Sequence, residues 1–353
     1  MEYQKSVQEL LNQLSQPGFC VCNGIITAAN QAAEAMLLNV GSAISDILET
    51  CADDYAGFSG GVLYLPLQIS GQFHNATVTR LDNMDLFLLE QDEDAGQFQA
   101  LSLISMELRK PLMNVITSAR KLQELCDAED SQPAASMNKN LMQLMRLVCN
   151  LSDVSRYQVF SQKETREICS FLRELLEKAD ALISDCGIRI TSEFPREAIF
   201  TQIDPEQLER AIWNLISNAL KFTPRGGTVH IRLIRRNHRM FLSVTDNGSG
   251  IAENILATLF RRYQRSPAIE DSRFGLGLGM ALVRIAAANH GGTVLVDQPE
   301  GAGTRVTITL SITQSNGTDL RSPMLLPDYS SGWDHGLVEL SDCLGPDSYR
   351  DLL

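Results

Sequence analysis

The chain has 353 residues, enough for two or three domains that each bury a core. Its composition, 44% hydrophobic and 21% charged, is ordinary for a soluble globular protein, and its formal net charge of -13 disfavours nucleic-acid binding. No apolar run approaches the roughly 20 residues that cross a bilayer, and no export signal is visible, so we expect a cytoplasmic protein with no membrane span. The eight cysteines lack the spacing of a metal site, so we expect reduced thiols.

Residues 1–94 are expected to form a small α+β domain. Strand-like runs bounded by turn residues lie at 19–26, 62–69, 73–81 and 84–90, with an alanine-rich helical stretch at 30–38. The order strand, helix, strands is typical of a small α+β sensor-like domain. The runs GFCVCNGII and NQAA, which begin at Gly18 and Asn30, resemble those of a PAS domain. The resemblance implies a sensor module and indicates no particular ligand.

Residues 97–158 are expected to form a helical hairpin. Apolar residues three or four positions apart run from Leu101 to Cys126, and the spacing resumes from Met137 to Leu151 after an acidic, proline-containing break at 128–136. One hairpin buries its apolar stripe only in part, so we expect two chains to pair in a dimeric four-helix bundle. The alternative is a hairpin that packs against another domain of its own chain.

The first of four local motifs in residues 165–312 is an amphipathic helix, LERAIWNLISNALKF, that ends at Thr223-Pro224. Asn214, Asn218 and Lys221 stand three or four positions apart and therefore share a face of this helix. Two amides and a lysine aligned in this way favour a site for a cation and phosphate. Mg²⁺ prefers hard oxygen ligands and keeps several waters, so one amide oxygen plus phosphate oxygens would suffice.

Three glycine-containing motifs follow, TDNGSG, FGLGLGM and GAGT. The glycines of the first two are Gly248, Gly250, Gly275, Gly277 and Gly279. In the first motif a strand ends at Asp246, which can accept a hydrogen bond from the exocyclic amine of adenine, and the glycines let backbone approach a flat ligand. The second precedes a helix, whose N-terminal N–H groups suit phosphate. The third, which ends at Thr304, indicates only a turn, and the spacing excludes a dinucleotide fingerprint and a P-loop.

Together and in this order, these motifs and FRRY at 260–263 resemble the N, G1, F, G2 and G3 boxes of the histidine kinase catalytic domain. The resemblance implies an α/β sandwich of the Bergerat type that binds ATP and Mg²⁺ under a glycine-rich lid. It implies Asn218 as the Mg²⁺ ligand, Lys221 as a phosphate contact and Asp246 as the residue that reads adenine. The fold class is therefore expected to be multidomain α+β.

The same resemblance assigns the remaining pocket residues. It places Asn214, Arg265, Thr304 and the five glycines around the nucleotide, with Arg265 as a phosphate contact on the lid side. Related ATPases carry a water-activating glutamate at the position of Asn214. Because an amide is no general base, we do not expect fast ATP hydrolysis.

Upstream, SMELRKPL at 105–112 resembles the H box of the family, SHELRTPL. Met106 stands at the position of the phosphoacceptor histidine, and Lys110 replaces the threonine associated with phosphatase activity. Glu107, which orients the histidine in the family, is kept but is left with nothing to orient, so we regard it as vestigial. A thioether is a poor nucleophile toward phosphorus, so we expect no autophosphorylation in cis. None of the five histidines lies on the expected hairpin.

The sequence therefore predicts a sensor histidine-kinase-like protein of two-component signalling that binds ATP and Mg²⁺ and acts as a pseudokinase regulator or scaffold. Its expected partners are a second copy or a complete histidine kinase, and a response regulator. One alternative is an active kinase that phosphorylates a histidine on a partner subunit, or a serine or threonine such as Ser105. Another is a structural module whose nucleotide site is vestigial.

Residues 313–353 close the chain with seven acidic residues and two arginines, together with several prolines and glycines. This composition is typical of a segment without a core of its own. We expect either a flexible acidic tail or a docking peptide.

Overall fold

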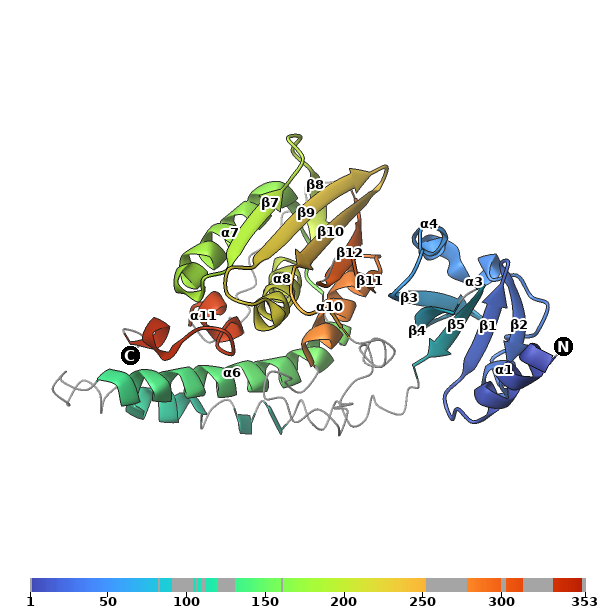
Figure 1. Cartoon of the computed structure of the whole chain (residues 1–353), viewed down its shortest axis with the longest axis horizontal. Helices are drawn as coiled ribbons and strands as arrows, with labels where there is room; N and C mark the ends of the chain where they lie inside the picture. The colour runs from blue at the N-terminus through green and yellow to red at the C-terminus, as the bar shows by residue number, and fades with distance from the viewer. Residues whose placement is uncertain are drawn as a thin grey trace.

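The computed structural model describes residues 2–81, 83–90, 104–105, 107–108, 112–119, 131–159, 161–251, 278–299, 303–313 and 333–350. These residues form an N-terminal α+β domain, a helical region dominated by one long helix, and a second α/β domain (Figure 1). This mixed, multidomain α+β fold confirms the predicted fold class.

The N-terminal domain is a five-stranded antiparallel sheet in the order β2-β1-β5-β4-β3. Its elements are α1 (Glu2–Asn12), β1 (Gly18–Cys22), β2 (Ile25–Ala29), α2 (Gln31–Ala35), α3 (Ser45–Leu48), η1 (Glu49–Cys51), α4 (Ala52–Ala56), β3 (Val62–Ile69), β4 (Gln72–Leu81) and β5 (Met84–Leu89). The first expected run divides into β1 and β2 at a turn where Asn23 and Gly24 take positive φ. Phe19 and Phe87 stack in the core with their ring centroids 4.8 Å apart. Helix α1 and the short helices α3 and α4 were not predicted.

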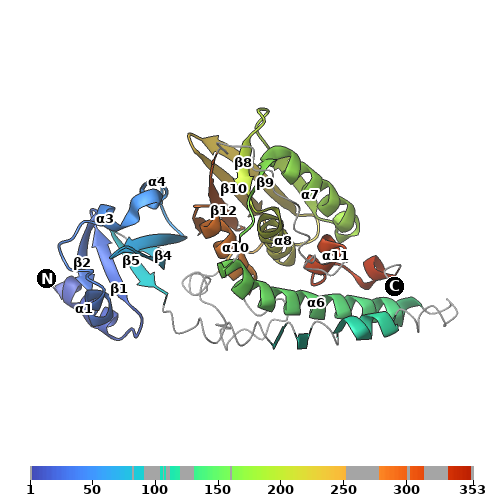
Figure 2. The same cartoon turned by 180° about the vertical axis from the view of Figure 1, so that it is seen from behind.

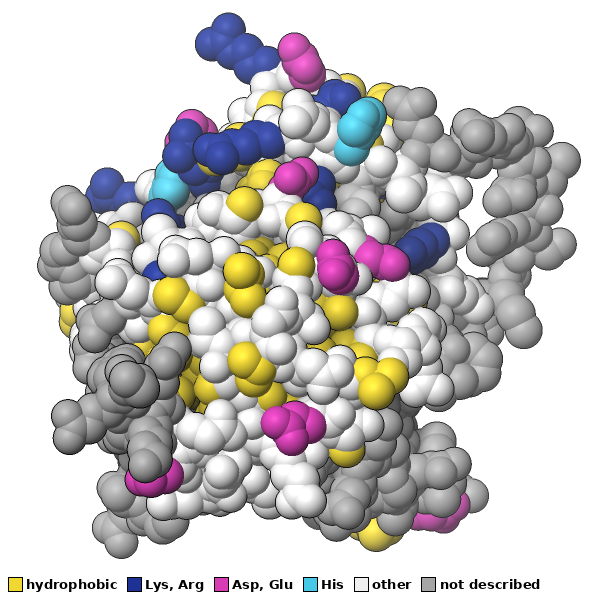
Figure 3. Space-filling view, turned by 90° about the vertical axis from the view of Figure 1, so that its right-hand side faces the viewer, with side chains coloured by type: hydrophobic (Ala, Val, Ile, Leu, Met, Phe, Trp, Pro, Cys, Tyr) yellow, Lys and Arg dark blue, Asp and Glu magenta, His cyan; other side chains and the backbone are white. Residues whose placement is uncertain are grey.

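The outer end of this domain exposes several large hydrophobic side chains. Figure 3 views the molecule from that end and shows hydrophobic side chains spread over the middle of the face. The exposed set in this domain is Leu10, Ile25, Leu37, Val40, Phe73 and Leu81. Scattered exposed apolar residues are normal on soluble proteins, and we attach no site to them.

The helical region is built on α6 (Ser131–Val159), a helix of 29 residues. Helical residues at 104–105, 107–108 and 112–119 supply described parts of the other arm. Helix α6 begins inside the expected break, because Pro133 falls in its first turn, where a missing N–H costs nothing. The apolar stripe has two parts: Ile116, Met142 and Met145 are buried within the chain, whereas Leu108 and Leu144 are each 49% exposed.

The second domain, which is of the α/β type, contains a sheet in the order β11-β12-β10-β9-β7 and a separate pair of strands, β6 and β8. Its elements are β6 (Glu164–Glu167), α7 (Ile168–Ile183), η3 (Ser184–Cys186), β7 (Arg189–Glu193), β8 (Phe200–Ile203), α8 (Pro205–Phe222), β9 (Thr228–Arg236), β10 (Arg239–Asp246), α10 (Leu278–Asn289), β11 (Val294–Asp297) and β12 (Arg305–Ser311). Pairing is antiparallel except between β7 and β9. Figure 2 shows α7, α8 and α10 on one face of the sheet, and their buried residues join those of the strands in one core.

The two sheets are continuous through an antiparallel pairing of β3 with β11, in which Leu63 faces Leu295. The approach is close, since a methyl group at Gly61 would stand 2.2 Å from the carbonyl oxygen of Val296. Beside this seam, Asp54 accepts hydrogen bonds from the hydroxyls of Thr293, at 3.0 Å, and Thr309, at 3.1 Å, and pairs with Arg239. The result is one sheet of ten strands that joins the two domains.

Residues 333–350, hereafter the C-terminal segment, pack against the second domain and α6 through α11 (His335–Glu339) and η4 (Pro346–Tyr349). Val338, Leu340 and Tyr349 are completely buried, and Gly336 lies so close to Leu182 that an added methyl group would stand 2.4 Å away. In Figures 1 and 2, α11 lies between α6 and the helices of the domain. This part of the expected tail is therefore packed against the rest of its own chain.

No helix among the described residues is long and apolar enough to cross a membrane.

Candidate nucleotide site

Helix α8 positions the predicted amide and lysine side chains. The carboxylate of Asp204 caps its N-terminus by accepting the N–H of Gln207 at 3.1 Å, Pro205 occupies the first turn, and the helix ends at Thr223 as expected. Asn214 is 1% exposed, whereas Asn218 and Lys221, one and two turns later, are partly exposed. The shared face therefore runs from the protein interior to an accessible end.

Asp246 ends β10 and is 7% exposed. Its Oδ1 accepts the backbone N–H groups of Gly248, at 2.9 Å, and Thr304, at 3.2 Å. Burial raises the pKa of this carboxyl, and the two N–H donors oppose that effect. Within the described part of the chain, Oδ2 makes no hydrogen bond, so it is available to a ligand that donates one.

Two glycines near Asp246 lie so close to backbone carbonyl oxygens that no side chain would fit. A methyl group at Gly248 would stand 2.2 Å from the carbonyl oxygen of Phe222 at the end of α8. Gly303 has a φ of +98°, and a methyl group there would stand 1.9 Å from the carbonyl oxygen of Asp246. Both conditions exclude a side chain, so the turn after β10, the turn before β12 and the end of α8 converge on the Asp246 carboxylate.

Asn214 joins three helices. Its Nδ2 donates to the carbonyl oxygen of Arg210 at 2.9 Å, and its Oδ1 accepts from Arg146 of α6 at 3.3 Å. Gly279 in the first turn of α10 also approaches it, since an added methyl group would lie 2.6 Å from Oδ1. The amide is thus engaged in helix packing at the inner end of the site.

Comparison with known proteins identifies this arrangement. Residues 203–314 match the family of histidine kinase-, DNA gyrase B- and HSP90-like ATPases. The chain is 29% identical over 257 residues to the histidine protein kinase DivJ of Caulobacter vibrioides, which covers 70% of this chain and 43% of DivJ. It is 32% identical over 241 residues to hybrid signal transduction histidine kinase D of Dictyostelium discoideum, covering 64% of this chain and 15% of that protein.

A solved structure agrees with these relatives. Full-length ShkA, crystallised in complex with AMPPNP, superposes with a TM-score of 0.51 at 25% identity, over 62% of this chain and 47% of ShkA. The chain carries a histidine-kinase-type ATPase domain and is similar to sensor histidine kinases. It spans less than half the length of the two curated relatives named above.

In this histidine kinase relative, the accessible end of α8 is met by the C-terminal segment, which sequence reasoning did not connect to the site. Lys221 Nζ lies 2.7 Å from Asp342 Oδ2, and Arg146 lies 2.7 Å from the same carboxylate. Although burial favours the neutral acid, Arg146 and Lys221 together hold the pKa of Asp342 below its usual range. The only signal in the sequence was the acidity of the tail.

Not every predicted kinase site residue lies in the described part of the chain. Met106, Arg265, Gly275 and Gly277 fall outside it. Gly250, with a φ of +73°, follows Gly248 as expected, and Thr304 meets Asp246 through its backbone N–H. Glu107 is exposed, whereas Ser105 beside it is completely buried.

The residues present suit a magnesium ion bound together with a triphosphate. Asn218 offers a hard amide oxygen on the accessible side of α8 and makes no hydrogen bond to any residue that the structure describes. Within those same residues no group of three or more His, Cys, Asp or Glu side chains gathers as a metal cage. A single amide ligand fits an ion that takes its other oxygens from phosphates and water.

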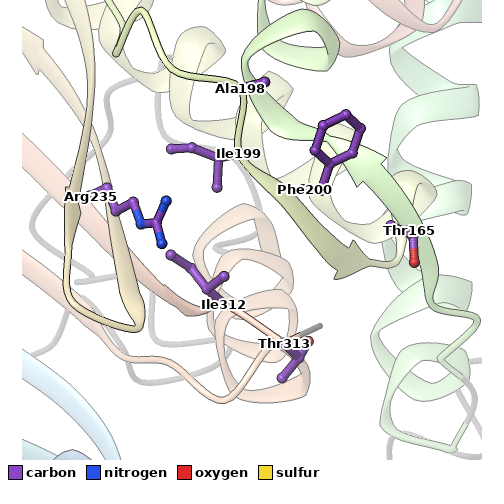
Figure 4. A pocket seen from close by; sticks show the side chains of 7 residues that line it. All are labelled: Thr165, Ala198, Ile199, Phe200, Arg235, Ile312 and Thr313. Carbon is purple, nitrogen blue, oxygen red and sulfur yellow. The ribbon is translucent and has the colours of Figure 1, made fainter. Parts of the chain in front are cut away.

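A separate cavity of about 350 Å³ lies elsewhere in the domain. Figure 4 shows its lining side chains, among them Phe200 of β8, Arg235 of β9 and Ile312 after β12. None of Asp246, Asn218 and Lys221 lines it. The cavity is therefore distinct from the candidate nucleotide site.

Proposed function

We propose that this chain binds ATP and Mg²⁺ in its histidine-kinase-type domain and regulates or scaffolds two-component signalling without phosphorylating itself. The observation that carries the proposal is the Asp246 carboxylate, whose Oδ1 is fixed by two backbone N–H groups while Oδ2 is left for a donor. The exocyclic amine of adenine is such a donor, and guanine presents a carbonyl oxygen at the corresponding place. The site therefore suits adenine.

The other residues divide the remaining roles. Asn218 would hold Mg²⁺, which supplies charge neutralisation to the phosphates, and the Lys221 ammonium would contact the phosphates directly. Asn214 is a buried amide held by Arg146 and cannot take a proton from water. These features support nucleotide binding with slow hydrolysis rather than an ATPase cycle.

The missing acceptor makes the chain a pseudokinase in this proposal. Met106 has no lone pair that attacks phosphorus effectively, and Glu107 alone supplies no nucleophile. The alternative acceptor Ser105 is completely buried, which disfavours phosphoryl transfer to its hydroxyl. Transfer to a histidine on a partner subunit stays open as the second candidate.

The proposed partners are inferred from the exposed apolar side chains of the helical hairpin and from the similarity to histidine kinases. Ile104, Leu108, Val115 and Leu144 are 49–54% exposed, and pairing with a second hairpin would bury them. We therefore propose a homodimer, or a heterodimer with a complete histidine kinase, that works with a response regulator in the cytoplasm. The N-terminal domain, with its strand, helix and strand order, serves as a PAS-like sensor in this proposal.

Equilibrium dialysis with ATP tests the nucleotide part of the proposal. Wild-type protein should bind ATP more tightly with Mg²⁺ than with EDTA, and Asn218→Ala should remove that Mg²⁺-dependent gain. Asn39→Ala, which changes an exposed asparagine of the N-terminal domain, is the matched control and should bind as wild type. Absence of ATP binding to the wild-type chain would make the site vestigial.

A further inference from the structure

The C-terminal segment brings two carboxylates to the interface between α6 and α8. Glu339 lies 3.1 Å from Arg146 and 3.4 Å from Arg210, and it is completely buried. Asp342 lies 2.7 Å from both Arg146 and Lys221, and its side chain is 32% exposed. The two acids thus differ in setting: one is sealed in the interface, and the other lies at its accessible edge.

With the C-terminal segment docked, each cation that the structure describes at this interface has a carboxylate partner. Three cations converge from α6 and α8, and their side chains are nearly or fully buried: Arg146 at 6%, Arg210 at 0% and Lys221 at 10% exposed. One carboxylate from α6 itself, Asp153, lies 2.9 Å from Arg210. Buried cations need paired anions, so the remaining two positive charges are matched by Glu339 and Asp342.

Asp342 is placed where an anionic ligand of α8 would lie. It contacts the ammonium of Lys221, and the next residue, Cys343, has its Sγ 3.4 Å from the carbonyl oxygen of Ser217, the residue before Asn218. The carboxylate therefore lies at the same accessible end of α8 as the proposed Mg²⁺ ligand. A carboxylate and a phosphate oxygen make the same charge-assisted hydrogen bond to an ammonium group.

We propose that Asp342 is an internal competitor of the ATP phosphates for Lys221, so that the docked C-terminal segment lowers the affinity of the chain for ATP. This inference rests on the proposed ATP binding and adds a means of regulating it. Glu339 and the buried apolar residues Val338 and Leu340 anchor the segment. The Asp342 carboxylate is the group that must leave Lys221 when phosphate binds. Phosphate binding and the Lys221–Asp342 pair exclude each other, so anything that loosens the segment strengthens ATP binding, and the reverse.

The test measures affinities for ATP and for adenosine in the full chain. Asp342→Asn removes the competing charge and should bind ATP about tenfold tighter, the order of one charge-assisted hydrogen bond, with adenosine affinity unchanged. Asp342→Glu keeps the charge and should keep the wild-type ATP affinity. Asp347→Asn makes the same charge change in the same segment, but Asp347 is 68% exposed and pairs with Arg350, so wild-type affinity is expected.

Tryptophan emission shows whether the segment stays docked in these variants. The chain has two tryptophans, and both report on this interface: Trp333 belongs to the segment, and Trp213 of α8 is buried next to Gly336. Unchanged emission in Asp342→Asn assigns its tighter ATP binding to the lost carboxylate rather than to undocking of the whole segment.

The outcomes separate the inference from the function on which it rests. Equal ATP affinity in wild type and Asp342→Asn would overturn the competition and leave ATP binding intact. An equal gain for adenosine would also overturn it, because the effect would then not depend on phosphate. A gain in ATP affinity for Asp347→Asn with unchanged emission would overturn it too, because that gain would not depend on the Asp342 carboxylate. If no variant binds any nucleotide, the proposed function fails and the inference fails with it.

Discussion

The carboxylate of Asp246 accepts the backbone N–H of Thr304 at 3.2 Å, although 58 residues separate them along the chain. This contact brings the turn before β12 to the end of β10 and fixes the carboxylate for a ligand. Asp246→Asn replaces one acceptor oxygen with a donor group, so ATP binding should weaken by about tenfold or more and preference for ATP over GTP should be lost. Nucleotide titrations measure both effects. The control Asp185→Asn changes an exposed aspartate of the same domain and should leave them unchanged.

Gly303 tests the geometry behind that contact. Gly303→Ala adds a methyl group 1.9 Å from the carbonyl oxygen of Asp246 in a left-handed backbone, whereas Gly226→Ala adds one at a φ of +85° with nothing within 4 Å. The free energy of unfolding, measured with urea, should fall by about 1 kcal/mol for Gly226→Ala and by clearly more for Gly303→Ala. Equal losses in the two variants would mean that the close approach has no energetic weight.

The capping carboxylate of Glu167 should make the stability of the fold depend on pH. Its carboxylate caps α7 by accepting N–H groups of Cys169 at 3.0 Å and Ser170 at 2.6 Å, and it also accepts from Ile199. Burial disfavours its ionised form, but these hydrogen bonds outweigh burial and lower its pKa to about 2 from a usual 4.5. A lowered folded-state pKa stabilises the fold above the unfolded-state pKa, and that contribution disappears as pH falls toward 2.

Glu167→Ala should therefore lower the free energy of unfolding at pH 7 by about 1 kcal/mol, and the difference from wild type should shrink between pH 4.5 and pH 2. Urea unfolding at several pH values measures this. Glu164→Ala, on the exposed strand β6, should show neither effect. A difference that stays constant down to pH 2 would contradict the capping role.

The seam between the two domains depends on Asp54, whose side chain is 3% exposed where it pairs with Arg239. Asp54→Asn leaves the Arg239 guanidinium without its charge partner, so we expect a loss of about 3 kcal/mol in stability. Hydrogen exchange should also become faster along β3 and β11, which pair beside it. Asp53→Asn changes the exposed aspartate next to Asp54 and should alter neither the stability nor the hydrogen exchange. Unaltered exchange in Asp54→Asn would mean that strand pairing alone holds the domains.

Local patterns predicted the elements that carry their own signals. The apolar period and the stop at Thr223 marked α8, and a strand-like run followed by a turn marked β3 with its observed bounds. The glycine turns marked the neighbourhood of Asp246. These features depend on residues a few positions apart, which one sequence displays directly.

The local sequence patterns did not predict the packing between segments that are far apart along the chain. The pairing of β3 with β11 joins strands more than 200 residues apart, and neither strand encodes its partner in its own pattern. Glu339 and Asp342 belong to an acidic stretch that is typical of solvated chain, and Arg146 and Arg210 look like exposed charges on amphipathic helices. Only the fold shows that these four side chains meet and are mostly buried.

The central claim is that the nucleotide site is kept while the phosphoacceptor is lost, and labelling with ATP that carries a radioactive γ-phosphate tests it most directly. Wild-type chain and Met106→His are incubated with labelled ATP and Mg²⁺, and protein-bound label is measured after removal of free nucleotide. We expect no label on the wild-type chain and an acid-labile, base-stable label on Met106→His. Stable label on any residue of the wild-type chain would contradict the account.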